Sequence, residues 1–228
     1  MRIDKYLAHN QFGSRNDVKK ILKDKLVYVN DELVTKASYQ VNLDKDIVTV
    51  NDEVIEYLEK FYVMINKPTG YICSHHSNLY PSVLELLPFD PDNTIMVGRL
   101  DVDTEGLLLI TNDGQFSHRI AHGKKDITKT YFVKLRDDFN KKYIDIFKEG
   151  ILMDESILKP AETEVLSNDT LLLTISEGKY HQVKRMMHYA DNEVIYLKRM
   201  SIGKLQLDEH LELGAYRHLT DEEIAYFD

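Results

Sequence analysis

The first 50 residues change from a helical to an extended hydrophobic period. Apolar residues recur three and four apart in residues 3–8 and again in residues 18–22, which predicts two short amphipathic helices. Ser14 precedes the second helix and can cap its free amides. From residue 26 to residue 50 apolar and polar residues alternate, and Asn30-Asp31 supplies a turn, so we expect strands there.

A polar, acidic stretch at residues 51–60 then precedes a sharply apolar strand at residues 61–65. Such a stretch is typical of a linker, and Asn66 to Gly70 reads as the turn after the strand. We therefore expect two domains, residues 1–58 and residues 59–228. Further elements follow from the same periods: strands at 94–97, 107–110, 129–135 and 171–175, a turn at Asn112-Asp113-Gly114, and an amphipathic helix over 183–190.

Composition adds the class of protein. With 228 residues and 43% hydrophobic residues the chain can bury a real core. No apolar run approaches the roughly 20 residues of a membrane helix, and the start MRIDKYLAHN lacks a secretory signal, so we expect a cytoplasmic protein without a membrane partner. The single cysteine, Cys73, excludes an internal disulfide and predicts a buried, inert thiol.

The charge is unevenly distributed. The net charge is −9, yet residues 1–25 hold seven Lys/Arg against three Asp/Glu, and residues 179–204 hold six against two. Residues 205–228 hold one against seven, so much of the acidity lies at the C-terminus. Two basic stretches on an acidic chain favour a directed nucleic-acid surface, although solvated lysines would give the same count.

The densest candidate for chemistry is GRLDVDTEGLLLITNDG, residues 98–114. Its second half is a buried strand, and its first half packs three acids and an arginine between two glycines. Taken by spacing alone this is more often an acid-rich turn than a site, because aspartate commonly accepts backbone amides. In the same way Tyr131, on a predicted strand, would by default only pack, and the basic stretch at residues 179–185 could be a solvated turn.

Other candidate functional residues give weaker signals. His118 and His122 are four apart, a spacing that can bind a metal, but no glutamate stands between them and no third ligand is evident. No glycine-rich phosphate loop occurs. We therefore expect neither a metal nor a cofactor.

The N-terminal segment RIDKYLA…GSRNDVKKILKDKLVYVND resembles the alpha-L RNA-binding domain that is shared with a small-subunit ribosomal protein. In that family the second helix and the following turn lie against RNA. The resemblance implies that Arg15, Lys19 and Lys20 contact phosphates.

Residues 98–114 resemble the active-site motif of pseudouridine synthases, specifically the branch of ribosomal small-subunit pseudouridine synthase A. The resemblance implies that Asp101 is the catalytic nucleophile and that Arg99 helps the target base leave the stack. It also implies that Tyr131, in KTYFVKL, stacks on the uracil. In SEGKYHQVKRMM it gives Lys184 the role of pairing with Asp101, with Arg185 as runner-up; such a cation keeps a desolvated carboxylate ionised.

The resemblance extends over essentially the whole chain, including LGAYRHLTDEEI. It implies an α+β fold: a mixed, largely antiparallel sheet with flanking helices, preceded by the small RNA-binding domain. Two positions depart from the pattern: Glu105 stands where relatives often have a small polar residue, and Lys184 stands where sister branches use arginine. Several polar residues are expected to contact RNA, namely Arg15, Lys19, Lys20, Arg99, Lys179, His181, Gln182 and Arg185.

The function that follows is isomerisation of a specific uridine to pseudouridine in ribosomal RNA, preferably that of the small subunit (16S) within an assembly intermediate, by a monomer. Several alternatives stay open: a large-subunit enzyme, a non-catalytic ribosome-assembly factor, and a hydrolase in which Asp101 works with Asp103 or Glu105 as an acid and base pair. The covalent route, through the anomeric carbon, the uracil ring or a glycal, also stays open.

Overall fold

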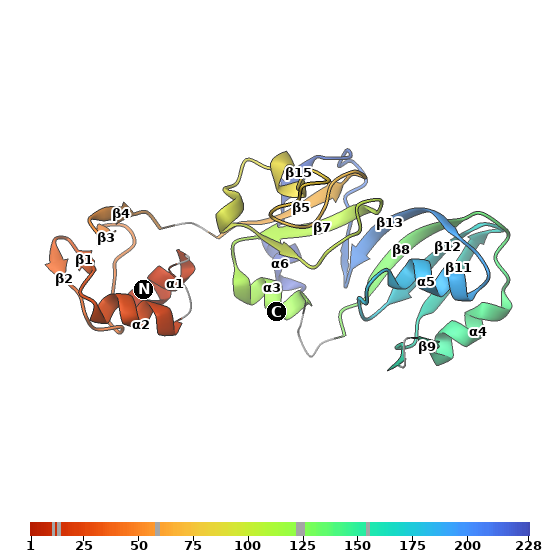
Figure 1. Cartoon of the computed structure of the whole chain (residues 1–228), viewed down its shortest axis with the longest axis horizontal. Helices are drawn as coiled ribbons and strands as arrows, with labels where there is room; N and C mark the ends of the chain where they lie inside the picture. The colour runs from red at the N-terminus through yellow and green to blue at the C-terminus, as the bar shows by residue number, and fades with distance from the viewer. Residues whose placement is uncertain (11, 13–14, 58–59, 122–125, 154–155) are drawn as a thin grey trace. The chain divides into compact units, whose positions relative to one another are not determined.

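The computed structural model describes residues 1–10, 12, 15–57, 60–121, 126–153 and 156–228. Its contacts divide the chain into two units, Met1–Lys60 and Phe61–Asp228 (Figure 1). The buried apolar residues of the described chain follow the same division, because one cluster lies within the first unit and two lie within the second. The expected boundary between residues 58 and 59 falls outside the described residues.

The first unit packs two helices on a small antiparallel sheet. Its elements are α1 (Ile3–His9), α2 (Arg15–Lys23), β1 (Val27–Val29), β2 (Glu32–Leu33), β3 (Val48–Val50) and β4 (Glu53–Ile55), with strand order β2-β1-β3-β4. The helical stripes expected at residues 3–8 and 18–22 supply Ile3, Leu7, Val18 and Leu22, all at most 1% exposed. Ser14, the expected cap of the second helix, lies outside the described residues.

Two tight turns build this small sheet. Asn30-Asp31 and Asn51-Asp52 adopt positive φ angles between 50° and 65° and join β1 to β2 and β3 to β4. Asparagine and aspartate tolerate this left-handed conformation, which matches the twist of a hairpin. The prediction of a linker over residues 51–60 was therefore wrong for residues 53–55, where β4 pairs with β3. The composition of residues 51–60 hid this strand, because it lies at the edge of the sheet and its Val54 is 64% exposed.

The second unit is built on one sheet. Its strands are β5 (Tyr62–Lys67), β6 (Ile95–Val97), β7 (Glu105–Thr111), β8 (Lys129–Leu135), β11 (Glu162–Ser167), β12 (Thr170–Ile175), β13 (Val194–Ile202), β14 (Leu205–Gln206) and β15 (Tyr216–His218). The order is β11-β12-β8-β13-β7-β5-β15, with β14 beside β13 and β6 beside β7. Among the described strand pairs of this sheet only β13 and β7 run parallel. The expected mixed, largely antiparallel sheet and the α+β class are confirmed.

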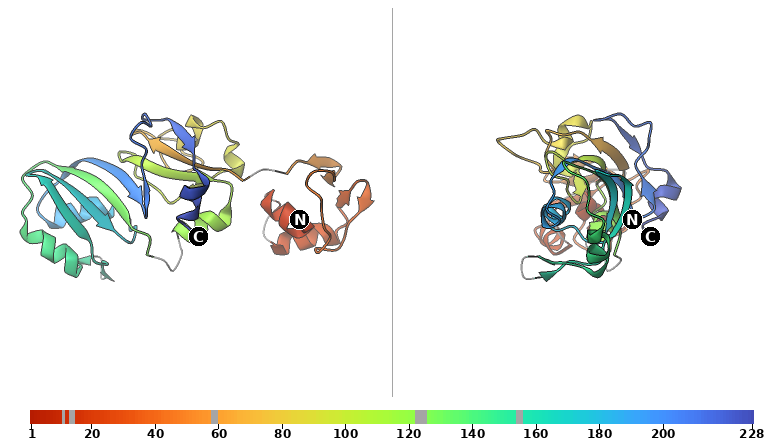
Figure 2. Two further views of the ribbon diagram at one scale, coloured as in Figure 1. Left: turned by 180° about the vertical axis from the view of Figure 1, so that it is seen from behind. Right: turned by 90° about the vertical axis from the view of Figure 1, so that its right-hand side faces the viewer.

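Helices cover both faces of this sheet. They are α3 (Gly114–Ala121), α4 (Lys142–Glu149), α5 (Gln182–Tyr189) and α6 (Asp221–Ala225), with short 3-10 turns at Val83–Leu86 and Pro91–Asn93 and a two-stranded ribbon, β9 (Leu152–Met153) with β10 (Ser156–Ile157). The views from three sides place α5 and α6 against opposite faces (Figures 1 and 2). Alternation along β7 explains this, because Leu108 and Ile110 belong to the cluster that contains α5, whereas Leu107 and Leu109 belong to the cluster that contains α3.

Two boundaries differ from the sequence-based expectation. Asn66 and Lys67, which were assigned to a turn, continue β5 and are buried. Asp113 does not merely turn the chain after β7, because its carboxylate accepts hydrogen bonds from the amides of Gln115 and Phe116 at the start of α3. The stretch is a helix cap, which a turn signature alone does not distinguish. None of the described helices combines the length and apolar character that crossing a membrane requires.

Candidate active site

The acid-rich loop that precedes β7 is shaped by a buried lysine. Lys67, at the end of β5, is 0% exposed, and its ammonium donates to the carbonyl oxygens of Pro68 (3.0 Å), Asp101 (3.0 Å) and Thr104 (2.9 Å). The amide of Thr104 donates to the Asp101 carbonyl, which closes the turn. Burial lowers the pKa of Lys67, and nearby acidic groups partly offset that effect. All three lysine donors are used, and two of them hold this loop.

The end of the loop approaches β13 at the parallel strand pair. Gly106 has a φ of 104°, and a Cβ there would collide with the backbone carbonyl oxygen of Arg199. Only glycine fits this conformation and this spacing. The side chain of Arg199 is 2% exposed and donates from Nε to the Leu107 carbonyl at 2.7 Å. The loop is therefore anchored on both sides, by Lys67 from β5 and by Arg199 from β13.

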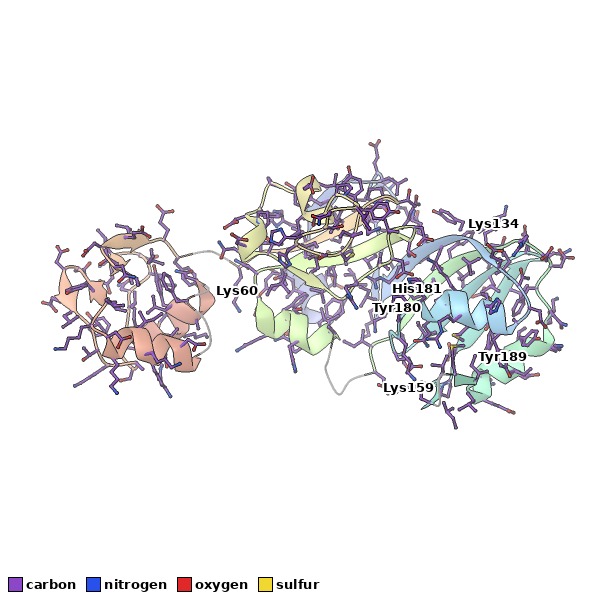
Figure 3. All side chains as sticks on the ribbon, in the orientation of Figure 1. Lys60, Lys134, Lys159, Tyr180, His181 and Tyr189 are labelled. Carbon is purple, nitrogen blue, oxygen red and sulfur yellow. The ribbon has the colours of Figure 1, made fainter. Side chains whose placement is uncertain are left out.

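The carboxylate of Asp101 lies between two residues at the start of α5. Its Oδ2 is 3.3 Å from the Nζ of Lys184, and its Oδ1 is 3.5 Å from the Nε2 of His181. The side chain is 28% exposed, so it is neither dry nor fully solvated. His181 has a left-handed conformation (φ 48°) and stacks on Tyr180 at 3.8 Å between ring centroids, at the N-terminal end of α5 (Figure 3).

Lys184 also contacts a second acid of the loop. Its Nζ donates to Oδ1 of Asp103 at 2.5 Å. Burial opposes the charge of Lys184, but the hydrogen bond with Asp103 and the charges of both aspartates outweigh it and raise the pKa of Lys184. Burial likewise acts to raise the pKa of the Asp103 carboxyl, yet the hydrogen bond and charge of Lys184 prevail and lower it. Lys184 is thus a bridge between two aspartates.

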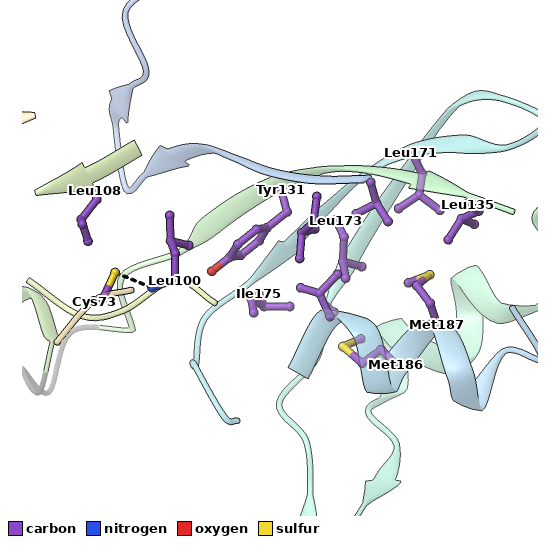
Figure 4. Close-up of a cluster of buried hydrophobic side chains, with 14 of the residues drawn as sticks. Cys73, Leu100, Leu108, Tyr131, Leu135, Leu171, Leu173, Ile175, Met186 and Met187 are labelled. Atoms are coloured by element: carbon purple, nitrogen blue, oxygen red, sulfur yellow. Dashed lines mark hydrogen bonds between the residues drawn. The ribbon is translucent and has the colours of Figure 1, made fainter. Parts of the chain in front are cut away.

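A pocket of about 80 Å³ opens beside these groups. Tyr131, on β8, is 7% exposed and lines this pocket together with Asp101, Leu197 of β13 and Ile175 of β12. In Figure 4 the ring of Tyr131 extends from β8 toward Leu100. The pocket therefore has an apolar wall and floor and a charged rim. Apolar walls with a few polar groups at the rim are typical of pockets that bind small molecules or bases.

The same pocket brings together several of the residues expected to contact RNA. Arg99, Lys179, His181 and Gln182 all line it. Arg99 is exposed and forms no hydrogen bond or ion pair with any described residue. Lys179 is exposed and donates to the Oγ of Ser156 at 2.7 Å. Arg99 and Lys179 give the rim a positive character.

Two of the side chains expected to contact RNA form hydrogen bonds within the protein instead. Gln182 is 4% exposed; its amide oxygen accepts from the backbone of Lys179, and its amide nitrogen donates to Glu177. Gln182 thus holds the turn before α5. Arg185, the runner-up for pairing with Asp101, donates instead to the carbonyl oxygen of Tyr180 at 3.3 Å.

In the first unit, the expected RNA contacts lie on α2. Lys19 and Lys20 are exposed, and Lys20 is 3.7 Å from Asp17 on the same helix. An exposed pair of this kind contributes little to stability, so these lysines are available to a polyanion. The side chain of Arg15 lies outside the described residues.

Sequence reasoning missed three contributors to the site. Lys67 was taken as part of a turn, Asp103 was considered as an acid or base partner of Asp101 in a hydrolase but given no role in a pseudouridine synthase, and Arg199 was not singled out. A charged residue at the end of a strongly apolar strand is a signal that could have found Lys67, because a buried lysine needs partners.

Glu105, which departs from the family pattern, accepts a hydrogen bond from the hydroxyl of Tyr196 at 2.7 Å. Burial and this bond raise the pKa of Tyr196.

The single cysteine is a buried thiol. Cys73 is 8% exposed, and its sulfur accepts from the amide of Leu100 at 3.3 Å, drawn as a dashed line in Figure 4. Burial raises the pKa of this thiol, which disfavours a reactive thiolate. His122 lies outside the described residues, and within the described part of the chain no three His, Cys, Asp or Glu side chains are grouped to hold a metal ion.

Comparison with known families identifies the class of protein. Residues 61–189 match the RNA pseudouridylate synthase family, and residues 1–48 match the S4 domain. The chain therefore belongs to the RNA pseudouridylate synthase family and carries an S4 domain at its N-terminus, as the sequence resemblance indicated. It is a pseudouridine synthase, an isomerase that acts on RNA.

Individual relatives agree over the full length. The chain is 41% identical to ribosomal small subunit pseudouridine synthase A of Haemophilus influenzae over 228 residues, covering 98% of both chains. It is also 41% identical to an uncharacterized RNA pseudouridine synthase of Bacillus subtilis over 234 residues, with 98% and 97% covered. A solved pseudouridylate synthase structure matches all of both chains with 40% identity and a TM-score of 0.73.

Proposed function

We propose that this protein converts a specific uridine of small-subunit (16S) ribosomal RNA to pseudouridine, with Asp101 as the nucleophile. The observation that carries the proposal is the position of the Asp101 carboxylate, at the rim of a pocket lined by Tyr131 and 3.3 Å from the ammonium of Lys184. A carboxylate beside a cation stays ionised in a partly desolvated site. An ionised oxygen next to a ring-sized pocket supplies what nucleophilic catalysis requires.

The reaction breaks the bond between N1 of uracil and the ribose, turns the base, and joins C5 to the ribose carbon. The proton on C5 is lost and N1 gains one, so the change is an isomerisation without net redox chemistry. Each group of the pocket has a part in this proposal: Asp101 attacks, Lys184 balances its charge, and Tyr131 stacks on the base.

The target nucleotide has to leave the RNA stack to reach Asp101, at a cost of a few kcal/mol. Arg99 is exposed at the pocket rim without a partner among the described residues. A planar guanidinium stacks well on nucleobases, so in this proposal Arg99 fills the space that the base vacates. Lys179 and His181 extend the positive rim toward the phosphate backbone.

The choice of RNA rests on the relatives. Curated relatives about 40% identical over their full lengths are named ribosomal small subunit pseudouridine synthase A. The S4 domain adds exposed lysines on α2, which suit binding to structured RNA through its phosphates. We infer 16S ribosomal RNA, in an assembly intermediate within the cytoplasm, as the substrate, and a monomer as the active form.

The test is to incubate the protein with 16S ribosomal RNA, with small-subunit assembly intermediates and with 23S ribosomal RNA, and to map pseudouridine by carbodiimide-dependent stops of reverse transcription. We expect one stop in the small-subunit RNA with the unaltered protein and none with Asp101→Asn. Because the nucleophilic oxygen is absent from the amide, activity should fall by at least about 10⁴-fold.

A matched control is Asp145→Asn, which removes the same charge from an exposed side chain on α4 that forms no ion pair with any described residue. It should modify RNA at the normal rate. Modification that survives in Asp101→Asn would assign the nucleophile to another residue. Modification of 23S ribosomal RNA alone would refute the small-subunit substrate but not the chemistry.

A further inference from the structure

The bridge formed by Lys184 is unequal. Its ammonium is 2.5 Å from Oδ1 of Asp103 but 3.3 Å from Oδ2 of Asp101. The shorter contact is a charge-assisted hydrogen bond, whereas the longer one is an ion pair without hydrogen-bond geometry of comparable quality. In the structure, therefore, the acid outside the pocket holds the cation more closely than the acid that lines the pocket.

This arrangement bears on the reactivity of Asp101. A lysine in close contact with a nucleophilic carboxylate lowers its basicity, and nucleophilicity falls with basicity. A lysine that is absent leaves the carboxylate prone to protonation when the pocket closes on a base. An intermediate position keeps Asp101 charged and leaves its oxygens free to attack.

We propose that Asp103 is a positioning residue of the reaction. It holds the Lys184 ammonium away from Asp101, so that the nucleophilic carboxylate is ionised but its oxygens are not tied up in a tight hydrogen bond. The inference rests on the proposed function, in which Asp101 attacks. It assigns a role to an acid that the motif alone leaves as part of a turn.

None of the other charged and titratable described groups around Asp101 can hold Lys184 in the way that Asp103 does. They are Arg99 on the same loop, His181 and Lys179 before α5, Lys67 from β5 and Tyr131 from β8. Lys67 contacts the backbone carbonyl of Asp101 and not its carboxylate, and His181 faces the opposite oxygen, Oδ1. Among the described residues, Asp103 alone shares a partner, Lys184, with Oδ2 of Asp101.

Asp103 is also open to substitution without loss of the fold. Its side chain is 63% exposed, and the loop backbone is held by Lys67 and Gly106 independently of it. Asp103→Asn keeps the shape and removes the charge. Asp103→Glu keeps the charge on a longer arm.

The experiment has two readouts on Asp103→Asn, Asp103→Glu, the control Asp145→Asn and the unaltered protein. The first is a carbon-13 NMR titration of the Asp101 carboxyl carbon, assigned by its loss in Asp101→Asn. The second is the dependence of kcat on pH under saturating RNA. Removing a negative neighbour and releasing Lys184 both favour the ionised form of Asp101, so its titration midpoint in Asp103→Asn should fall by about half a pH unit or more.

For the same reason the acidic limb of the kcat profile should move to lower pH in Asp103→Asn, while the plateau falls about three- to tenfold with little change in KM. Asp103→Glu should restore most of the plateau, and Asp145→Asn should match the unaltered protein in both readouts. An unchanged midpoint in Asp103→Asn, or an equal shift in Asp145→Asn, would overturn the inference. If the unaltered protein modifies no RNA, the proposed function fails, and the titration still decides whether Asp103 acts on Asp101.

Discussion

Lys67 has the least ordinary environment of the residues around the site. Lysine is almost never fully buried unless it is paired, yet Lys67 is 0% exposed and its partners are three carbonyl oxygens and no carboxylate. Two of these oxygens belong to Asp101 and Thr104, residues at the two ends of one turn. The lysine therefore fixes the direction in which the turn presents the Asp101 side chain.

We predict that Lys67→Met lowers both stability and activity. Methionine fills a similar volume but removes the ammonium from three carbonyl oxygens, of which, among the described residues, only that of Asp101 keeps another donor, the amide of Thr104, so the free energy of unfolding should fall by about 2–4 kcal/mol. Displacement of the turn should reduce kcat about 100-fold with little change in KM. Urea unfolding and single-turnover kinetics measure the two effects. Lys204→Met, at an exposed lysine that forms no hydrogen bond or ion pair with any described residue, is the matched control and should behave like the unaltered protein.

At the scale of elements, Arg217 joins three segments near the C-terminus. It lies on β15, and its guanidinium donates two bonds of 2.8 Å to Glu223 of α6 and one of 2.6 Å to Asp208. These bonds raise the pKa of Arg217, and its hydrogen bond is the main cause that lowers the pKa of the Glu223 carboxyl. Glu223 also closes a capping box with Thr220 at the start of α6. The short helix depends on this cluster because five residues cannot hold a helix alone.

We predict that Arg217→Met destabilises the second unit by about 1 kcal/mol at neutral pH, since both partners remain partly solvated. Because the pKa of Glu223 is lowered in the folded state, its stabilisation is present above its ordinary value and is lost as the pH falls through the lowered one. The difference in unfolding free energy between the two proteins should therefore shrink below about pH 4. Denaturant titrations at neutral and acidic pH measure it, and a difference that is constant with pH would contradict the ion pair as its cause.

At the scale of the whole molecule, each unit has buried apolar clusters of its own among the described residues. The cluster that contains Ile3 and Val50 draws only on residues of the first unit, and the clusters around Leu107 and Leu108 draw only on the second. Each unit should therefore fold without the other. The proposed reactive groups all lie in the second unit, whereas α2 offers its lysines in the first.

We predict that residues 61–228 expressed alone unfold cooperatively and retain most of kcat at saturating RNA, but bind ribosomal RNA about tenfold more weakly, because two linked contacts reinforce each other. The dependence of affinity on salt should become shallower as phosphate contacts are lost. Thermal unfolding, filter binding at several salt concentrations and kinetics on 16S ribosomal RNA test this. If the fragment and the full chain had equal affinity and equal salt dependence, the S4 domain would not contribute to RNA binding.

Much of this fold was predictable from local patterns. The helical and extended periods placed α1, α2, β7, β8, β12 and α5 within a few residues of their observed bounds, because such periods reflect which side of an element is buried. The α+β class and the family are confirmed. The prediction failed for β4, an edge strand in which Glu53 and Val54 are exposed and Ile55 is only partly buried, so that its three residues show no alternation of apolar and polar positions.

The sequence by itself predicted most of the main elements, and the resemblance of one contiguous motif to a known family supplied Asp101 as the candidate nucleophile. Only the tertiary structure decided what surrounds that carboxylate. Lys67 reaches its loop from 34 residues away, Arg199 and Gly106 meet through the parallel strand pair, and Lys184 divides its contacts between Asp101 and Asp103, which precede it by more than 80 residues. Such contacts follow from the packing of distant elements, and of these only the pair of Lys184 with Asp101 was indicated beforehand, by the family resemblance.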